Sequence, residues 1–410
     1  MKYMVILCDG MADEPLEELG GKTPMEAAHK PNMNELGKDA EMGQVRTIPE
    51  GMSSGSDIAN LSVLGYDPRV YYTGRSPIEA LSIGIPMEES DVSFRCNFVT
   101  LSEEEENYED KVILDHGAED ISTEEAVLLM EEIKKHFTTE KHQFYTGISY
   151  RNIMIEKEGT VVELTPPHDV LTRRIGEYLP DREVFRQMMI KSYEILNHHP
   201  INIARREKGL RPGNSIWFWG GGTRPKLASY EEVTGKKAAL FSAVDLLKGI
   251  AVGANITNME IEGAYGGLET NYRGIGRAAV KALVDEGHDL VYLHLEAPDE
   301  MSHQGSLESK ILAIEYIDEQ VIPEVLKGLR DSGEDFRLLI LPDHHTPVKK
   351  RTHTGDPVPY LLYDSRKKVP GSENFCERTA METGIFIEPG HELMKRFLLS
   401  KTCVMSGLMI

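Results

Sequence analysis

Side chains that could bind a metal ion follow an apolar run near the C-terminal end of the sequence. The run Phe336–Pro342 leads into Asp343, His344 and His345, and His353 returns from a loop rich in Gly and Pro. An apolar run bounded by polar residues predicts a buried strand, and open α/β sheets bind ligands at the carboxyl ends of strands. Carboxylate oxygen and imidazole nitrogen are donors that Mn²⁺ or Zn²⁺ takes. Taken alone, these residues fit equally well a polar loop whose histidines bond to backbone.

Two further apolar runs end in acidic residues. Tyr3–Leu7 precedes Asp9, and Leu290–Leu295 precedes Asp299, with His303 four residues later. Residues i and i+4 share one face of a helical turn, so Asp299 and His303 could bind one ion together. Three carboxylates are costly to bury at one edge of a sheet unless cations neutralise them. Together, the runs predict a site for two metal ions.

Ser56 is the hydroxyl that such a site could activate. It ends a loop rich in Gly and Ser, and a helical pattern begins at Ile58. A serine in this position commonly caps a helix through its side-chain oxygen. The N-terminus of a helix also favours an anion, and a metal ion can turn the hydroxyl into a nucleophile by lowering its pKa. This stretch alone leaves both interpretations open.

Four cationic side chains could hold an anionic substrate. Arg75 follows a turn, Arg151 lies between two predicted strands, Arg205 follows a long predicted helix, and Lys226 follows the glycine run of GGGTRPKL. Glycines let a backbone approach a ligand closely, and a lysine beyond them could reach a phosphate or carboxylate. Each signal is weak by itself, because most arginines in such loops only contact solvent.

Length and charge restrict the class of protein. A chain of 410 residues predicts a main domain with an inserted or second domain. The formal net charge of −22 argues against nucleic acid and anionic membranes as partners. The four cysteines lack disulfide or metal spacing, and no leader precedes the first strand, which together favour a reducing cytoplasm. Any small anionic substrate must therefore be held by metal ions or local arginines, and a homo-oligomer stays open.

The alternation of apolar runs and helical patterns predicts an α/β fold, a mostly parallel sheet flanked by helices. Between residues 113 and 179 the pattern changes to a helix and closely spaced short strands, among them Thr160–Leu164, followed by a helix from Asp169. This texture predicts a small inserted α+β cap domain. Residues 1–112 and 180–410 would then form the metal-binding core.

The motifs, taken in order, resemble those of the archaeal type of cofactor-independent phosphoglycerate mutase, in the alkaline phosphatase superfamily. They are Asp9, GSDIAN around Ser56, LGYDP, YTGR, APDExxH, PDHHTP and HTGDPVP, and the resemblance extends from Lys2 to about Pro359. It implies an alkaline-phosphatase-like core, two divalent ions and a phosphoserine intermediate. Mn²⁺ is the first choice of metal, with Zn²⁺, Mg²⁺ and Co²⁺ as alternatives.

The resemblance also implies a role for individual residues. One ion would be held by Asp299, His303 and His353. The other would be held by Asp9, Ser56, Asp343 and His344, with Ser56 as the nucleophile. His345 receives no role. The candidate contacts to the substrate's phosphate and carboxylate are Arg75, Arg151, Arg205 and Lys226. The implied reaction interconverts 3- and 2-phosphoglycerate in glycolysis without 2,3-bisphosphoglycerate.

Two departures from the family pattern concern the substrate. Residues 115–120 read DHGAED where the family usually has an arginine-rich run, and Trp219-Gly220 replaces Arg-Gly. In these features the chain resembles a branch proposed to act as homoserine kinases. The complete ligand set, Ser56 and the retained cations favour the mutase, and no nucleotide-binding fingerprint accompanies them. A non-catalytic metal-binding scaffold is the third hypothesis, which loss of a ligand or of Ser56 would have favoured.

Overall fold

The computed structural model describes residues 1–399 and divides into two compact units. The first unit consists of Met1–Tyr72 and the chain from Lys226 onwards, and the second is Thr73–Pro225. Within residues 1–399, every helix is too short or too polar to cross a membrane.

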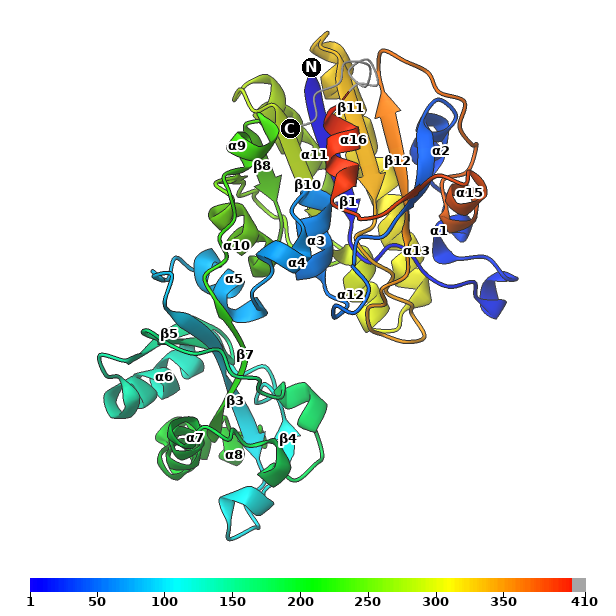
Figure 1. The fold of residues 1–410 in the computed structure, drawn as a ribbon. Helices are drawn as coiled ribbons and strands as arrows, with labels where there is room; N and C mark the ends of the chain where they lie inside the picture. The colour runs from blue at the N-terminus through cyan, green and yellow to red at the C-terminus, as the bar shows by residue number, and fades with distance from the viewer. Residues whose placement is uncertain (400–410) are drawn as a thin grey trace. The chain divides into compact units, whose positions relative to one another are not determined.

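The first unit is built on an eight-stranded sheet in the order β13-β2-β12-β11-β1-β10-β8-β9 (Figure 1). β11, β1, β10 and β8 are parallel, whereas β12 is antiparallel to its neighbours, so the predicted mostly parallel sheet is confirmed. The strands are β1 (Lys2–Cys8), β2 (Glu41–Val45), β8 (Ala238–Phe241), β9 (Thr257–Asn258), β10 (Leu290–Leu295), β11 (Phe336–Leu341), β12 (Val358–Asp364) and β13 (Phe386–Ile387).

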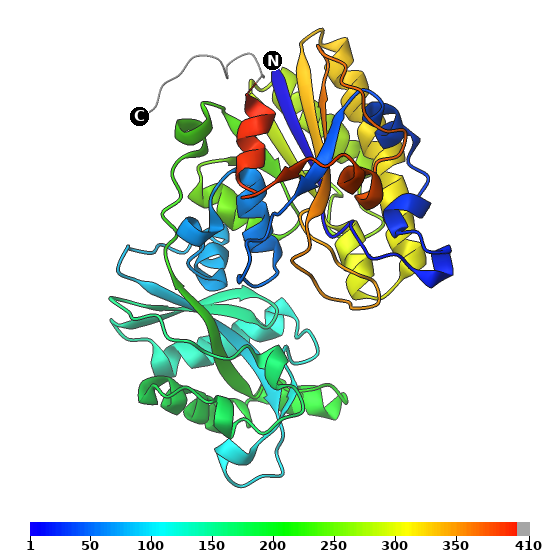
Figure 2. The same ribbon diagram turned by 45° about the vertical axis from the view of Figure 1, so that its right-hand side comes forward.

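Helices cover both faces of this sheet, which explains why its central strands are apolar throughout. On one face the rings of Tyr3 and Phe397 meet edge to face at 5.5 Å. In Figure 2, α16 (red) lies on one face of the sheet, and the yellow helices α13 and α14 lie on the opposite face. The helices are α1 (Pro24–Ala27), α2 (Pro31–Gly37), α3 (Ser56–Leu64), α4 (Pro68–Tyr71), α9 (Tyr230–Thr234), α10 (Asp245–Gly253), α11 (Tyr272–Val284), α12 (Ala297–His303), α13 (Leu307–Tyr316), α14 (Ile322–Asp331), α15 (Glu377–Glu382) and α16 (Glu392–Leu398).

The second unit has its own antiparallel sheet and its own core. Its sheet follows the order β4-β3-β6-β5, and β7 pairs with the other edge of β3. Phe94 of β3 and Phe185 of α7 pack edge to face at 5.0 Å in the core between sheet and helices. The elements are α5 (Arg75–Ser82), β3 (Val92–Leu101), β4 (Ile113–Asp115), α6 (Thr123–Phe137), β5 (His142–Ile148), β6 (Arg151–Glu156), α7 (Glu183–Leu196), α8 (Pro200–Glu207) and β7 (Ser215–Thr223).

This unit includes more of the sequence than the inserted domain predicted for residues 113–179. Val92 of β3 lies opposite both Glu156 of β6 and Thr223 of β7. Residues 73–112 and 180–225 therefore belong to the second unit, whereas the prediction gave them to the core. The pairing of β3 with β7 joins segments more than 100 residues apart, and local periodicity does not register such pairing.

Two predicted elements of the second unit are not formed. Residues 160–164 contain no strand, and only a short 3-10 turn, Pro167–Val170, stands where a helix from Asp169 was expected. Pro166 and Pro167 lack the N–H groups that a ladder or helix interior needs. The segment is held by side chains instead: Val162 and Leu164 pack on the core, and Trp217 Nε1 donates to the carbonyl of Thr165 at 2.9 Å.

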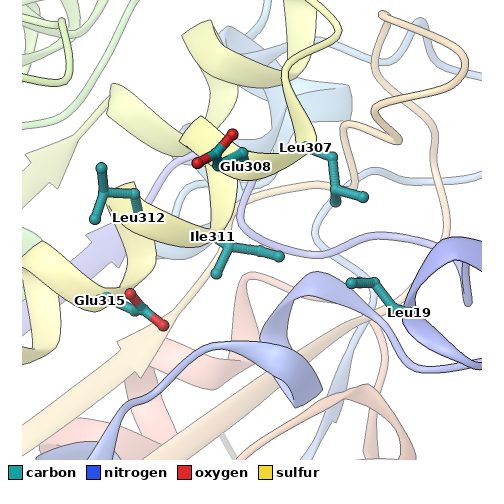
Figure 3. A pocket seen from close by; sticks show the side chains of 6 residues that line it. All are labelled: Leu19, Leu307, Glu308, Ile311, Leu312 and Glu315. Atoms are coloured by element: carbon teal, nitrogen blue, oxygen red, sulfur yellow. The ribbon is translucent and has the colours of Figure 1, made fainter.

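An apolar groove of about 490 Å³ lies in the first unit beside α13 (Figure 3). It is lined by Leu19, Leu307, Glu308, Ile311, Leu312 and Glu315. None of these is a predicted site residue, and the lining offers neither histidine nor cysteine. The groove therefore brings no metal or nucleophilic chemistry to the fold.

Candidate active site

The carboxyl ends of three neighbouring strands bring the predicted metal ligands together in the first unit. Asp9 follows β1, Asp343 follows β11, and α12 carries Asp299 and His303 just after β10. Parallel pairing places Cys8 opposite Leu295 and Leu7 opposite Leu341, so all three strands end at one edge. Asp9 and Asp343 are 1% and 0% exposed. The predicted cluster of buried carboxylates is therefore present.

Asp299, His303 and His353 form the first group. His303 Nε2 lies 3.1 Å from Asp299 Oδ2 and 2.9 Å from His353 Nε2, which lies 3.4 Å from Asp299 Oδ1. The hydrogen bond with Asp299 raises the pKa of His303 to about 9. Two imidazole nitrogens and a carboxylate that converge this closely are a donor set for a divalent transition metal.

Ser56, His344, Asp9 and Asp343 form the second group. Ser56 Oγ lies 3.0 Å from His344 Nε2, and this nitrogen is 3.4 Å from both Asp9 Oδ1 and Asp343 Oδ2. Burial, and then the charges of Asp343, Asp299 and Glu296, raise the pKa of Asp9 well above its usual range. Asp9 Oδ1 is also buried without a hydrogen-bond partner. A cation among these oxygens would supply the missing neutralisation.

Ser56 does not cap α3 through its side chain. Gly55 occupies the N-cap position with no side-chain capping bond, and Ser56 is the first helical residue. Asn60, one turn later, donates at 2.8 Å to both the Ser56 carbonyl and Asp343 Oδ2. The helix thus holds the Ser56 hydroxyl against the ligand cluster, which favours the nucleophile interpretation over the cap.

His345 behaves as the polar-loop alternative predicts. It is 8% exposed, its Nε2 lies 3.1 Å from the carbonyl of Pro357, and its backbone bridges to Met11, Ala12 and Thr354. It therefore ties two loops together, and the absence of an assigned role agrees with this position.

The structure adds His294, which the sequence analysis missed. Among residues 1–399, two groups have ligand atoms close enough to hold one ion: Asp299 with His344 and His353, and Asp9 with His294 and Asp343. His294 lies in β10 opposite Leu7, beside the end of β1. Burial lowers its pKa to about 4. A single histidine inside an apolar strand was the available signal, and Asn60, four residues after Ser56, was another.

A buried lysine ties together the two loops that carry the ligands. Lys310 of α13 is 0% exposed, and its Nζ donates to Asp13 Oδ2 at 2.8 Å. The same ammonium donates to the carbonyls of Ala12 at 3.2 Å and Thr346 at 2.9 Å. Ala12 follows Asp9, and Thr346 follows Asp343 and His344. Lys310 therefore fixes the separation of the strand ends that carry the metal ligands.

We expect Lys310→Met to lower the free energy of unfolding by about 3–5 kcal/mol, because it leaves the carboxylate of Asp13 buried without its cation. Urea unfolding followed by circular dichroism measures this loss. The matched control is Lys327→Met, which breaks an exposed pair with Asp331 and should leave the midpoint nearly unchanged. Adding Asp13→Asn to Lys310→Met should recover part of the loss. An unchanged midpoint for Lys310→Met would show that the hydrogen bonds of Lys310 do not contribute to the free energy of unfolding.

Comparisons with known proteins agree with this geometry. A model of the family "2,3-bisphosphoglycerate-independent phosphoglycerate mutase" matches residues 37–202. The curated protein of that name from Methanothrix thermoacetophila is 45% identical over 398 residues, which cover 96% of this chain and 99% of the relative. The one from Methanosarcina barkeri is 44% identical and covers 96% and 98%. The chain belongs to this family.

Solved structures show the same fold for this mutase family member. A protein from Pyrococcus horikoshii superposes with a TM-score of 0.80 at 30% identity, covering 97% of this chain and 96% of that one. The cofactor-independent phosphoglycerate mutase from Thermoplasma acidophilum superposes with a TM-score of 0.63 at 25% identity, covering 97% and 99%. The resemblance read from the spaced motifs is therefore confirmed over nearly the whole chain.

The predicted substrate cations of this mutase family member differ in their surroundings. Arg75 and Arg95 both pair with Glu79, at 3.2 and 3.0 Å. The pKa of Arg95 is lowered to about 10, chiefly by burial; the charge of Glu79 raises this pKa, and the charges of Arg75 and Arg151 lower it. Arg75, Arg95 and Arg151 thus gather in one part of the second unit. Lys226, in the first unit, is exposed.

Arg205 is buried and is hydrogen-bonded within the second unit. It is 3% exposed, and its guanidinium donates to Glu125 and to the carbonyls of Ala118 and Arg211. Three of its five N–H groups are thus bonded inside the second unit. A contact between Arg205 and the substrate stays a prediction.

The two departures from the family pattern serve the structure of the second unit. Asp115 Oδ1 accepts from the backbone of Gly117 and Glu119, and Glu119 Oε2 accepts from the backbone of Arg211. Trp219 is 8% exposed, and the guanidinium of Arg95 lies 4.4 Å from the centroid of its ring. The acidic run closes a tight turn, and Trp219 holds a cation in place by a cation–π contact.

Proposed function

We propose that this protein interconverts 3-phosphoglycerate and 2-phosphoglycerate through a phosphoserine formed on Ser56. The observation that carries the proposal is the Ser56 hydroxyl, held 3.0 Å from His344 inside a cluster of buried carboxylates and imidazoles. Membership of the family supports the choice of substrate.

The same cluster would hold two divalent ions. Asp299, His303 and His353 would hold one, and Asp9, Ser56, Asp343 and His344 the other. The buried Asp9 Oδ1 without a partner fits this assignment. We propose Mn²⁺, because the donors mix carboxylate oxygen with imidazole nitrogen, and Zn²⁺, Mg²⁺ and Co²⁺ are the alternatives. When bound, such ions lower the pKa of a hydroxyl and neutralise phosphoryl oxygens.

The chain's own residues account for two transfers. Ser56 Oγ forms a bond to phosphorus while the ester bond to the glycerate oxygen breaks and that oxygen takes a proton. The other hydroxyl of the same glycerate then attacks phosphorus, loses its proton and releases Ser56 as a hydroxyl. Asn60 steadies the start of α3 against Asp343 through both steps. The sum is an isomerisation that consumes no nucleotide.

We propose that Arg75, Arg151 and Lys226 bind the phosphate and carboxylate of the substrate. Arg75 and Arg151 gather around Arg95 and retain the planar guanidinium that binds such groups in bidentate fashion. The strongly negative chain needs these local cations, because its net charge of −22 repels an anionic substrate at long range.

We propose the reducing cytoplasm as the location. Cys8, Cys96 and Cys376 are buried and free. Burial raises the pKa of Cys8 and of Cys96, which keeps both as unreactive thiols.

Phosphorus NMR of the Mn²⁺-loaded protein tests the reaction. With 3-phosphoglycerate alone we expect the resonance of 2-phosphoglycerate to grow to equilibrium. With ATP and homoserine in place of phosphoglycerate, we expect no O-phosphohomoserine. Silence with 3-phosphoglycerate together with O-phosphohomoserine formation would replace the mutase by a kinase, the alternative raised by the DHGAED run and by Trp219.

A further inference from the structure

We infer that His294 is a metal ligand, an additional imidazole donor beside His344 for the ion that Asp9 and Asp343 hold. This inference rests on the proposed metal site and adds a residue that the family pattern did not assign. His294 is 1% exposed, and one of its ring nitrogens lies within 4.8 Å of a carboxylate oxygen of Asp9 and one of Asp343.

Two unpartnered atoms point to the ligand role. His294 Nε2 and Asp9 Oδ1 are both buried, and neither has a hydrogen-bond partner. Nε2 lies 3.0 Å from Asp9 Oδ2 but makes no hydrogen bond to it, so that contact does not satisfy the nitrogen. Buried polar atoms are nearly always satisfied, and an ion between nitrogen and carboxylates satisfies both atoms at once.

The other side of the ring has a partner that is compatible with the tautomer that a ligand needs. His294 Nδ1 lies 3.2 Å from Ser242 Oγ, and Ser242 Oγ accepts from the backbone N–H of Val244 at 3.0 Å. A serine oxygen has a second lone pair, which can accept the Nδ1 hydrogen, and in that tautomer Nε2 keeps a lone pair for an ion. Metal-binding histidines characteristically donate their other ring N–H in this way.

The sheet explains why these groups line up. Ser242 follows β8, His294 lies in β10, Asp9 follows β1 and Asp343 follows β11, and these four strands are consecutive neighbours. Parallel pairing, with Leu293 opposite Phe241 and Leu7 opposite His294, places Ser242 level with His294. Leu7 opposite Leu341 places Asp9 level with Asp343, two residues nearer the carboxyl edge of the sheet. The backbone register therefore positions His294 rigidly, as a ligand position requires.

The test is Co²⁺ binding to the chelator-treated full chain, followed by calorimetry and by the visible absorption of the bound ion. For His294→Gln we expect affinity for one of two ions to fall by at least about 100-fold and the cobalt spectrum of that ion to change. Ser242→Ala keeps the ligand and removes only its support, so we expect a loss of about 10-fold with the spectrum retained.

The matched control is His288→Gln. His288 is also a buried histidine of the first unit with an unpartnered Nε2, but it belongs to neither metal-ligand group of residues 1–399, and its variant should bind both ions normally. Two ions bound by His294→Gln with unchanged affinity and spectrum would overturn the inference and leave the proposed function standing. Failure of the unchanged protein to bind Co²⁺ would overturn both. If His294→Gln does not fold, full cobalt affinity in Ser242→Ala overturns the inference.

Discussion

Ser56→Ala is expected to lower the turnover of 3-phosphoglycerate by about 10⁴-fold or more while the protein stays folded. The substitution removes the oxygen that would carry the phosphoryl group between the two hydroxyls of glycerate, and removing a nucleophile costs far more than removing a binding contact. Stability should change little, because Ser56 Oγ makes no capping bond in α3. Initial rates of 2-phosphoglycerate formation and a thermal unfolding curve measure the two effects.

Ser54→Ala is the control for this loss. Ser54 lies in the same loop, is exposed, and belongs to neither metal-ligand group, so its variant should retain normal rates. Mass spectrometry of acid-quenched protein after brief incubation with 3-phosphoglycerate should find phosphate on Ser56 of the unchanged chain. Normal turnover by Ser56→Ala, or phosphate on another residue, would remove Ser56 from the mechanism.

The metal ligands could be predicted because they follow a simple rule of parallel sheets. Asp9, Asp299 and Asp343 come after apolar runs, and the carboxyl ends of adjacent parallel strands meet at one edge. The pattern shows that they converge, and it does not show which oxygen meets which nitrogen. That detail depends on side-chain packing. The packing places His344 close both to Asp299 with His353 and to Asp9, so that it lies between the two groups.

The residues that sequence analysis missed or misplaced depend on contacts between distant segments. His294 lies in a run that reads as an ordinary buried strand, and its partner Ser242 lies 52 residues earlier. Arg205 is bound by Glu125, which lies 80 residues away in the sequence. The boundaries of the second unit depend on the pairing of β3 with β7. The local periodicity of the sequence does not predict any of these long-range contacts.

The opposite pKa shifts of Asp9 and Asp299 also could not be predicted from the sequence. Burial raises the pKa of Asp299, but hydrogen bonds with His303 and His353 outweigh it and hold that pKa well below its usual range. Asp9 receives no such hydrogen bond, and its pKa is raised. In the metal-free protein, the fold therefore tolerates the charge of Asp9 less than that of Asp299.

Asp9→Asn is consequently expected to act in opposite directions on stability and on function. Without metal, it removes a buried charge that faces Asp343 and Asp299, and we expect the free energy of unfolding to rise by about 1–3 kcal/mol. With metal, it removes an anionic ligand, so affinity for one ion should fall by at least about 100-fold and mutase activity should be lost. Urea unfolding of chelator-treated protein and Mn²⁺ calorimetry measure the two effects.

The stability gain of Asp9→Asn should depend on pH, which distinguishes it from a gain that comes from packing alone. A carboxyl with a raised pKa keeps its proton in the folded protein at pH values where the unfolded chain, with a pKa near 3.8, has released it. Metal-free protein therefore loses stability as pH rises from about 4 through the folded pKa of Asp9, and Asp9→Asn lacks this contribution. The advantage of the variant should grow with pH across that window, whereas Asp331→Asn, an exposed control, should show no such trend. A metal-free Asp9→Asn protein less stable than the unchanged chain at neutral pH would mean that Asp9 serves the fold, and the reading of the cluster as a charge-strained metal site would fail.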